Sequence, residues 1–410
     1  MDIGSAEFLE RLRQAIDDEI NSLQESTQSQ ALKSRRNALA PISSLPPETL
    51  ATIFSFLSPS KGNEEVYHLG WLFVSHVCRR WRETALYHLR LWSHINFSKL
   101  TSTGVAEMLS RAKMAPLHLE VDFTDWSNGQ FDTFEGHLEA HISHICHLGV
   151  LGLGYFQTEL ERHISSAPAL ESLSLSHDAV QAAIPVNLFN YITPRLASLE
   201  ITNCSISWKS PLFKGLQTLK ICRPSSDGRP KLGDWLDALN EMSQLKTLIL
   251  SQATPQATLI TPEPLRAVTL PSLTTFHILG PTRECSLALA HLVFPSLTTL
   301  HIHDVFYVWN REKMRHLTPY VAQNVCQLQS TEPFRSILIG DKGACAEVLA
   351  WTIPDADVKV CDANLSFIAT DSANFIFAGT TFFDDLLALV PTNSILCLTA
   401  QNQKRLGKEF

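Results

Sequence analysis

Apolar residues recur every three or four positions in the first part of the chain, with acids and amides between them. Between residues 6 and 23 the apolar set is Phe8, Leu9, Leu12, Ile16, Ile20 and Leu23. This spacing puts one apolar stripe along a helix. The stretch is too short for the several heptads of a dimerising coiled coil, so the pattern predicts a small helical arm over residues 1–40.

Two further stretches with helical spacing lie in residues 41–98. The first follows Pro46 and Pro47, which suit the first turn of a helix. Its apolar residues are Leu50, Ile53, Phe54 and Leu57, and those of the second stretch are Val74, Val77, Cys78, Trp81 and Ala85. A unit of this size is too small to bury all of its apolar surface alone. We therefore expect another surface to cover one of its faces.

A strand-like motif repeats through the middle of the chain. The pattern Leu-x-Ser/Thr-apolar-x-Ile/Leu starts at Leu170, Leu196, Leu216, Leu245, Leu273 and Leu297, at separations of 20 to 29 residues. LGVLGL from Leu148 and FRSILI from Phe334 are degenerate outer copies. Alternate apolar residues of such strands point inward and stack on those of neighbouring repeats, because a single repeat has no core. The period predicts a solenoid of about eight strands.

The two helical stretches resemble an F-box. The order LPPETLATIFSFL, VSHVCRRWRETAL and LWSHI is similar to the F-box pattern, and the longer loop after the first segment resembles fungal-type members. The family's leucine-proline pair falls on Leu45 and Pro46, and its trailing tryptophan falls on Trp92. The resemblance implies a subunit that docks onto a Skp-type adaptor within a cullin-RING ubiquitin ligase and recognises an unknown protein substrate. A scaffold that binds the adaptor without promoting ubiquitin transfer is the alternative.

The same resemblance implies which residues bind the adaptor. The predicted contacts are Leu45, Pro46, Leu50, Ile53, Phe54, Leu57, Val77, Cys78 and Trp81. Leu45 and Phe54 are the expected anchors in the adaptor groove. Val77 and Trp81 are expected mainly to hold the helices together.

The repeating segment resembles leucine-rich repeats. Only Cys204 represents the asparagine or cysteine that this family places eight residues after the first leucine, so we expect an irregular solenoid. The predicted fold class is α/β, with an N-terminal helical F-box followed by an irregular leucine-rich-repeat solenoid of parallel strands and helices. The predicted segments are residues 1–40 (helical arm), 41–98 (F-box), 115–340 (solenoid) and 341–410 (divergent terminal repeats and cap).

The positions that flank the inward apolar pair of each repeat predict a binding surface on the concave face of the solenoid. One of these positions is always a hydroxyl residue: Ser172, Ser198, Thr218, Thr247, Thr275 and Thr299. Such hydroxyls also favour strand solvation and cross-strand hydrogen bonds without any ligand. The predicted substrate-binding residues are Glu200, Lys220, His277, His301 and His303. The three histidines suggest a polar, pH-sensitive recognition patch.

Charge and composition narrow the function further. The 410 residues carry a net charge of −8, so no global positive field draws the chain to nucleic acid or an anionic membrane. The basic cluster Lys33, Arg35 and Arg36 is interpreted as a solvated helix end, with a nuclear localisation signal as the alternative. No secretory signal or membrane span is predicted, which favours a cytoplasmic or nuclear location. The nine cysteines lack C-x-x-C spacing and are expected to be reduced.

Motifs that carry chemistry are scarce. His137, His141 and His144 have a helical spacing that can hold a metal, but the apolar stripe beside them indicates a solvated face, and no metal is predicted. The sequence has no G-x-S-x-G elbow, no G-x-x-x-x-G-K-S/T phosphate loop and no G-x-G-x-x-G turn. We therefore predict no enzymatic activity of its own and no cofactor.

Overall fold

The computed structural model combines helices with a largely parallel sheet, in agreement with the predicted α/β class. It describes Leu12 and residues 14–18, 27–57, 72–124, 128–155, 166–177, 182–185, 188–224, 229–255, 266–305, 336–341, 345–351, 365–370 and 397–402. The chain divides into two compact units. The helical unit comprises Met1–Val121 and His144–Cys146, and the sheet unit comprises Asp122–Ser143 and His147–Phe410. Each unit is described by itself.

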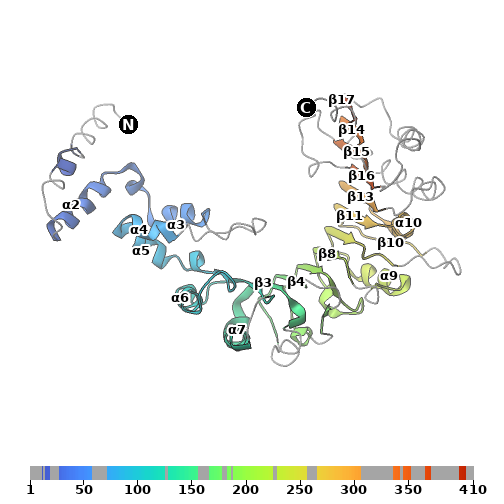
Figure 1. The fold of residues 1–410 in the computed structure, drawn as a ribbon, viewed down its shortest axis with the longest axis horizontal. Coiled ribbons are helices and arrows are strands. Elements are labelled where there is room, and N and C mark those ends of the chain that lie inside the picture. Colours follow the sequence, from blue (N-terminus) through green and yellow to red (C-terminus); the bar gives the residue numbers. More distant parts are fainter. Residues whose placement is uncertain are drawn as a thin grey trace, which may run out of the picture. The chain divides into compact units, whose positions relative to one another are not determined.

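Short helices dominate the helical unit (Figure 1). Its elements are α2 (Thr27–Ala38), η1 (Pro41–Ser44), α3 (Pro47–Ser55), α4 (Val74–Val77), α5 (Arg79–Tyr87), η4 (Leu89–Trp92), β1 (His94–Asn96), α6 (Ser102–Ala112) and β2 (Leu117–Asp122). Pro47 begins α3 as predicted, because a proline fits the first helical turn, where its missing N–H has no partner to lose. The side chain of Thr101 caps α6 by accepting a hydrogen bond from the backbone N–H of Gly104.

Aromatic side chains fill the core of the helical unit. The ring of Phe54 lies 5.1 Å from that of Trp81, and Phe54 is only 1% exposed. The indole N–H of the buried Trp92 donates to the carbonyl oxygen of Ala85 at 2.8 Å, and the Arg111 guanidinium lies 4.1 Å from the Trp92 ring. The buried indole therefore has both a hydrogen-bond acceptor and a cation over its ring.

One arginine connects the start of α5 to the segment before α3. Arg80 donates hydrogen bonds to the carbonyl oxygens of Ser43 and Leu45, which lie at the end of η1. The Ser43 hydroxyl donates in turn to the carbonyl oxygen of Asn37 in the last turn of α2, at 2.6 Å. These bonds satisfy helix-terminal carbonyls and hold the end of α2 near the start of α5.

In the sheet unit, strands lie side by side in a series that runs through Figure 1 from β3 onward. The helical elements are α7 (Asn128–His141), η5 (Ile142–His144), η6 (Leu153–Tyr155), η7 (Leu188–Tyr191), η8 (Pro211–Phe213), α9 (Leu232–Glu241) and α10 (Thr282–His291). The main sheet contains β3 (Ile145–Leu151), β4 (Ser172–Ser176), β6 (Ser198–Thr202), β8 (Thr218–Cys222), β9 (Thr247–Ser251), β11 (Thr275–Gly280), β13 (Thr299–Val305), β16 (Leu365–Thr370), β15 (Cys345–Trp351), β14 (Ser336–Asp341) and β17 (Cys397–Asn402), in that spatial order. Two small sheets pair β5 (Ala182–Ala183) with β7 (Cys204–Ser205), and β10 (Val268–Thr269) with β12 (Leu292–Val293).

The six strict copies of the motif form six consecutive parallel strands, which confirms the strands predicted from the repeat. Their central apolar residues align in one row, in which every member is fully buried: Leu173, Leu199, Leu219, Leu248, Phe276 and Leu300. Burial of one such side chain contributes roughly 1.5–3 kcal/mol, so the stacked row stabilises these six strands substantially. The strands that follow β13 differ, because β15 is antiparallel to both of its neighbours.

The chain turns out of three of these strands through a left-handed residue. Asn203, Arg223 and Gln252 follow β6, β8 and β9, with φ of 55°, 47° and 54°. The backbone N–H of each donates to a carbonyl oxygen at the end of the next strand, at 2.9, 2.7 and 2.6 Å respectively. These corners satisfy backbone groups without a ladder of asparagine side chains, which the sequence lacks. Cys204, at the family's asparagine position, is fully buried.

A buried polar cluster joins three consecutive repeats. Arg229 donates to the carbonyl oxygen of Thr254 from Nε at 3.1 Å and from Nη2 at 2.8 Å. Its Nη2 also forms an ion pair with Glu284 in the first turn of α10, and the Thr254 hydroxyl donates to the same carboxylate at 3.2 Å. The side chains of the ion pair are only 15% and 12% exposed. The cluster fixes the spacing of the segments that follow β8, β9 and β11.

Candidate functional site

The end of α3 and the turn that follows it expose an apolar stripe. Ile53, Phe56 and Leu57 are 39%, 81% and 54% exposed. The backbone N–H groups of Phe56 and Leu57 donate to the carbonyl oxygens of Ile53 and Phe54, at 3.2 and 3.0 Å, so the chain continues to turn after the helix ends. The spacing of three and four therefore keeps the three side chains on one side of α3. Leu50 and Phe54 lie on the buried side.

A second exposed apolar region flanks the short helix α4. Phe73 and Val77 are 73% and 56% exposed, whereas Val74 between them is buried. Cys78 is half-buried and has the extended backbone of an N-cap before α5. Both α3 and α4 contact α5, so the two apolar regions belong to one packed set of helices.

The structure divides the predicted adaptor-binding residues into three groups. Pro46, Ile53, Leu57 and Val77 are exposed, Leu45, Cys78 and Trp81 are half-buried, and Leu50 and Phe54 are buried. Phe54, one of the two predicted anchors in the adaptor groove, is buried because its ring packs on Trp81. Leu50 is buried as well. Their contacts with an adaptor stay predictions, and α3 carries apolar residues on both of its sides.

Sequence reasoning missed two exposed aromatic residues, Phe56 and Phe73. Phe56 lies three residues after Ile53, and this spacing was a usable signal for the exposed stripe. Phe73 directly precedes α4, and nothing in its local pattern distinguishes it from a core residue.

The exposed stripe on a small helical unit is typical of a protein-interaction domain, because monomeric proteins rarely expose contiguous apolar patches without a binding role. Residues 42–98 match the family model described as F-box-like. An F-box-like domain therefore occupies this segment, and domains of this family bind Skp-type adaptors. No curated protein matches the chain.

The side of the sheet opposite the buried row is polar. Its central row, set by the strand register, contains Ser174, Glu200, Lys220, Ile249, His277 and His301. We call the outward positions of β4, β6, β8, β9, β11 and β13 the polar face. Glu200 and Lys220 form an ion pair between neighbouring strands, with side chains 39% and 38% exposed. The structure thus brings these two predicted residues together.

The predicted histidines occupy two rows of the polar face. The rings of His277 and His301 are stacked, with centroids 4.2 Å apart and planes inclined by 15°. His303 lies two residues further along β13, directly beside Leu279 of β11. Burial lowers the pKa of His277 to about 4, and the nearby charge of His301 lowers it as well. The imidazole of His277 is therefore neutral near pH 7.

The hydroxyl row also aligns in register. Its six members are Ser172, Ser198, Thr218, Thr247, Thr275 and Thr299, all half-buried. Because all six side chains are small hydroxyls, this row of the polar face is uniform in size and chemistry. Both interpretations of the row, strand solvation and ligand contact, fit this geometry.

The remaining histidine group gives no sign of a ligand site. His137 and His141 lie on α7, and His144 is the last residue of η5. Burial lowers the pKa of His137; it also lowers the pKa of His144, although a backbone hydrogen bond with Lys113 opposes the effect. Within the residues that the structure describes, no three His, Cys, Asp or Glu side chains gather as metal ligands would. In the same part of the chain, no helix has the length and apolar character that a membrane crossing requires.

Proposed function

We propose that this chain is the substrate-recognition subunit of a Skp-cullin-F-box ubiquitin ligase. The observation that carries the proposal is the exposed stripe of Ile53, Phe56 and Leu57 on the F-box-like domain. A hydrophobic groove of a Skp-type adaptor would cover this stripe.

The energetics support a binding role for the stripe. Removal of apolar surface from water contributes about 25 cal/mol per Å², and a well-packed anchor at the centre of an interface contributes about 2 kcal/mol or more. Ile53 and Leu57 project from a helix whose other side is fixed in the core by Phe54. The stripe is therefore held in place before a partner arrives, which lowers the entropic cost of binding.

The sheet unit is proposed to be an irregular leucine-rich-repeat-like solenoid that presents the substrate. Three features support this: one parallel strand per repeat, fully buried leucine rows in register, and left-handed corners after successive strands. The proposed substrate contacts on the polar face are Glu200, Lys220, His277, His301 and His303. The number of residues between α3 and α4 fits the fungal type of F-box protein.

The proposed mechanism needs no catalytic residue in this chain. Tethering a substrate lysine near the ubiquitin-charged carrier converts a bimolecular encounter into an effectively intramolecular one. The helical unit would hold the ligase core and the sheet unit the substrate. The chain itself would perform no chemistry and need no cofactor.

A reconstituted ubiquitination reaction tests this function. The full chain, with the proteins that co-purify with it, is mixed with a Skp-type adaptor, the cullin-RING core and the charged carrier enzyme. We expect ubiquitin on a co-purifying protein, and loss of this product with the variant Ile53→Asp/Leu57→Asp. The matched control is Ile192→Asp, which changes a residue that is 51% exposed in the sheet unit.

The outcomes separate ligase from scaffold. Ubiquitin transfer that persists in the double variant contradicts the assigned adaptor surface. Adaptor binding without ubiquitin on any co-purifying protein contradicts the substrate-receptor role and supports a scaffold that binds the adaptor without promoting transfer.

A further inference from the structure

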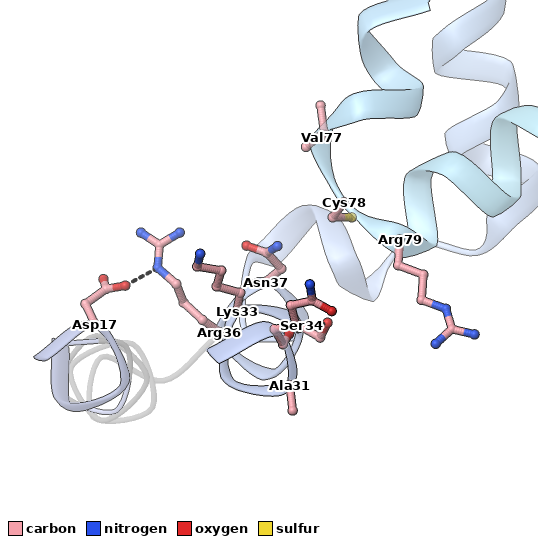
Figure 2. A pocket seen from close by; sticks show the side chains of 10 residues that line it. Asp17, Ala31, Lys33, Ser34, Arg36, Asn37, Val77, Cys78 and Arg79 are labelled. Atoms are coloured by element: carbon pink, nitrogen blue, oxygen red, sulfur yellow. Dashed lines mark hydrogen bonds and ion pairs between the residues drawn. The ribbon is translucent and has the colours of Figure 1, made fainter. Parts of the chain in front are cut away.

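An open cleft lies in the helical unit between α2 and the junction of α4 and α5. Its volume is about 740 Å³. Lys33, Arg36 and Asn37 of α2 line one side, and Val77, Cys78 and Arg79 of the junction line the other (Figure 2). Nothing in the F-box-like assignment accounts for this cleft, because α2 lies outside the matched residues 42–98.

The cleft is positively charged in a protein that is negative overall. Helix α2 contains three basic residues and no acidic ones, and α5 contains three arginines and one glutamate, whereas the whole chain has a net charge of −8. Two of the lining cations have partners, since Arg36 pairs with Asp17 and Arg79 pairs with Glu83 at 2.9 Å. The exposed amino group of Lys33 has no carboxylate partner among the described residues. Among the described residues that line the cleft, three are cationic (Lys33, Arg36 and Arg79) and one is acidic (Asp17).

The two sides of the cleft are held in position by half-buried hydrogen bonds. Arg80 binds the carbonyl oxygens of Ser43 and Leu45, and Ser43 binds Asn37 in the last turn of α2. Asn37 itself lines the cleft. The separation between the basic side of α2 and Arg79 is therefore fixed by the fold, in contrast to a chance grouping of surface lysines.

The lining indicates the chemistry of the ligand. Lys33 and Arg36 are one helical turn apart on one side, and Arg79 lies on the other, where its exposed side chain also pairs with Glu83. The cations are therefore spread apart, which suits several separate carboxylates better than one compact anion. Ser34 and Asn37 offer neutral hydrogen-bonding groups, and Val77 offers apolar surface that is 56% exposed. This mixture matches a peptide, which carries backbone amides and side-chain carbon between its charges.

We propose that the cleft between α2 and the α4–α5 junction binds an acidic peptide segment of a protein partner. Val77 also belongs to the exposed apolar region beside α4, so this cleft continues a surface that is already suited to protein contact. The proposal stands independently of the proposed function, because it rests on α2 and on the charge of the cleft. It gives Lys33 and Arg36 of the basic cluster a binding role, where the sequence predicted a solvated helix end.

Fluorescence anisotropy with a defined peptide tests the proposal. The probe is a labelled hexaglutamate peptide with blocked ends, titrated with the full chain at about 50 mM and about 300 mM NaCl. We expect binding at the lower salt concentration, weaker binding at the higher one, and none to hexaglutamine. The variant Lys33→Glu/Arg79→Glu should weaken hexaglutamate binding about tenfold or more, because like charges then face the peptide.

The matched control is Lys99→Glu/Lys214→Glu, which makes the same change in net charge at exposed positions outside the cleft. We expect it to change the affinity less than about twofold. Equal losses in the two double variants, or equal affinity for hexaglutamine, would overturn the proposal. Tighter binding of a thymidine oligonucleotide that the cleft variant abolishes would also overturn it, in favour of a nucleic-acid site. If a thermal melt shows that the charge reversal impairs folding, the hexaglutamate affinity of Lys33→Gln is measured at both salt concentrations instead. We expect this variant to bind more weakly than the parent and to depend less on salt, and an unchanged affinity would overturn the proposal.

Discussion

The two units differ in how far they bury their apolar side chains. In the sheet unit, the central row of the six motif strands is fully buried, and the outward positions are mostly polar. In the helical unit, α3 buries Leu50 and Phe54, whereas Ile53 and the following residues Phe56 and Leu57 are exposed. Repeats can bury each other's apolar faces, whereas a unit of a few short helices cannot. The six motif strands therefore bury their own apolar row, whereas the described part of the helical unit leaves apolar side chains exposed.

Charge shows a parallel difference. On the polar face of the sheet unit, Glu200 and Lys220 compensate each other and His277 is neutral near pH 7. In the helical unit, α2 and α5 carry six basic residues and one acidic residue. We expect contacts of the helical unit to weaken with salt more strongly than contacts of the polar face.

The largest change in unfolding free energy is expected from Phe54→Ala. This variant tests whether Phe54 stabilises the core or contacts the adaptor directly. Phe54→Ala removes a ring that packs on Trp81, and we expect it to lower the free energy of unfolding by about 3–5 kcal/mol. Phe56→Ala, at a residue 81% exposed, should change it by less than about 0.5 kcal/mol. Urea denaturation followed by tryptophan fluorescence measures both. A Phe54→Ala protein with parental stability but reduced adaptor affinity would show that Phe54 is a direct contact.

Removal of the buried ion pair between Arg229 and Glu284 should give the next largest change in unfolding free energy. Glu284→Ala leaves Arg229 with an uncompensated charge, and we expect a loss of about 2–4 kcal/mol in the free energy of unfolding. The control is Glu200→Ala, whose pair with Lys220 is much more exposed, and which should cost less than about 1 kcal/mol. Thermal and urea denaturation provide the comparison. If the two variants lose the same unfolding free energy, the buried ion pair stabilises the fold no more than the exposed one.

The lowered pKa of His277 predicts that the stability of the sheet unit depends on pH. Its pKa in the fold is about 4, below the value of about 6.5 expected in the unfolded chain, so the fold favours the neutral imidazole. The associated stability is fully present above about pH 6.5 and is lost as the pH falls toward 4. His277→Gln should reduce the loss of unfolding free energy between pH 7 and pH 4.5 by about 1 kcal/mol, since partial exposure screens the effect.

Urea denaturation at the two pH values measures this difference. His76→Gln is the control, because His76 is exposed in the helical unit. If His277→Gln and the parent lose the same stability on acidification, the stacked histidine pair does not set the pH dependence.

The smallest effect concerns the left-handed corners. Arg223 has a φ of 47°, a conformation that glycine adopts without steric cost, so Arg223→Gly should raise the free energy of unfolding by about 0.5 kcal/mol. Arg195→Gly, at an exposed turn residue without a positive φ, should lower it instead. Differential scanning calorimetry resolves the two directions. A loss of stability in Arg223→Gly would mean that contacts of the Arg223 side chain stabilise the fold more than its left-handed backbone destabilises it.

The sequence predicted the six motif strands of the sheet unit better than it predicted the helical unit. A motif that repeats six times fixes the strand positions and their register, because a slip of one residue would turn every leucine to the wrong face. The corners at Asn203, Arg223 and Gln252 were not predicted, since no common residue type marks them. The left-handed backbone there is imposed by the register of neighbouring strands.

The candidate site in the helical unit was only partly predictable. Helical spacing identified both apolar sides of α3, but only tertiary packing on Trp81 decides that Phe54 is buried and Ile53 exposed. The cleft beside α2 depends on Arg80, whose partner Ser43 is 37 residues away along the chain. Contacts of that separation leave no local pattern, so the basic cluster in α2 predicted only a solvated helix end.

The most direct test of the central claim is a calorimetric titration of a Skp-type adaptor into the full chain. The parent protein is compared with Ile53→Ala/Leu57→Ala, which shortens two exposed side chains and leaves the core residue Phe54 in place. We predict a loss of about 2 kcal/mol or more in binding free energy, roughly thirtyfold in Kd, with an unchanged thermal melt. Equal affinity of the two proteins for the adaptor would contradict the claim that this stripe is the surface a partner covers.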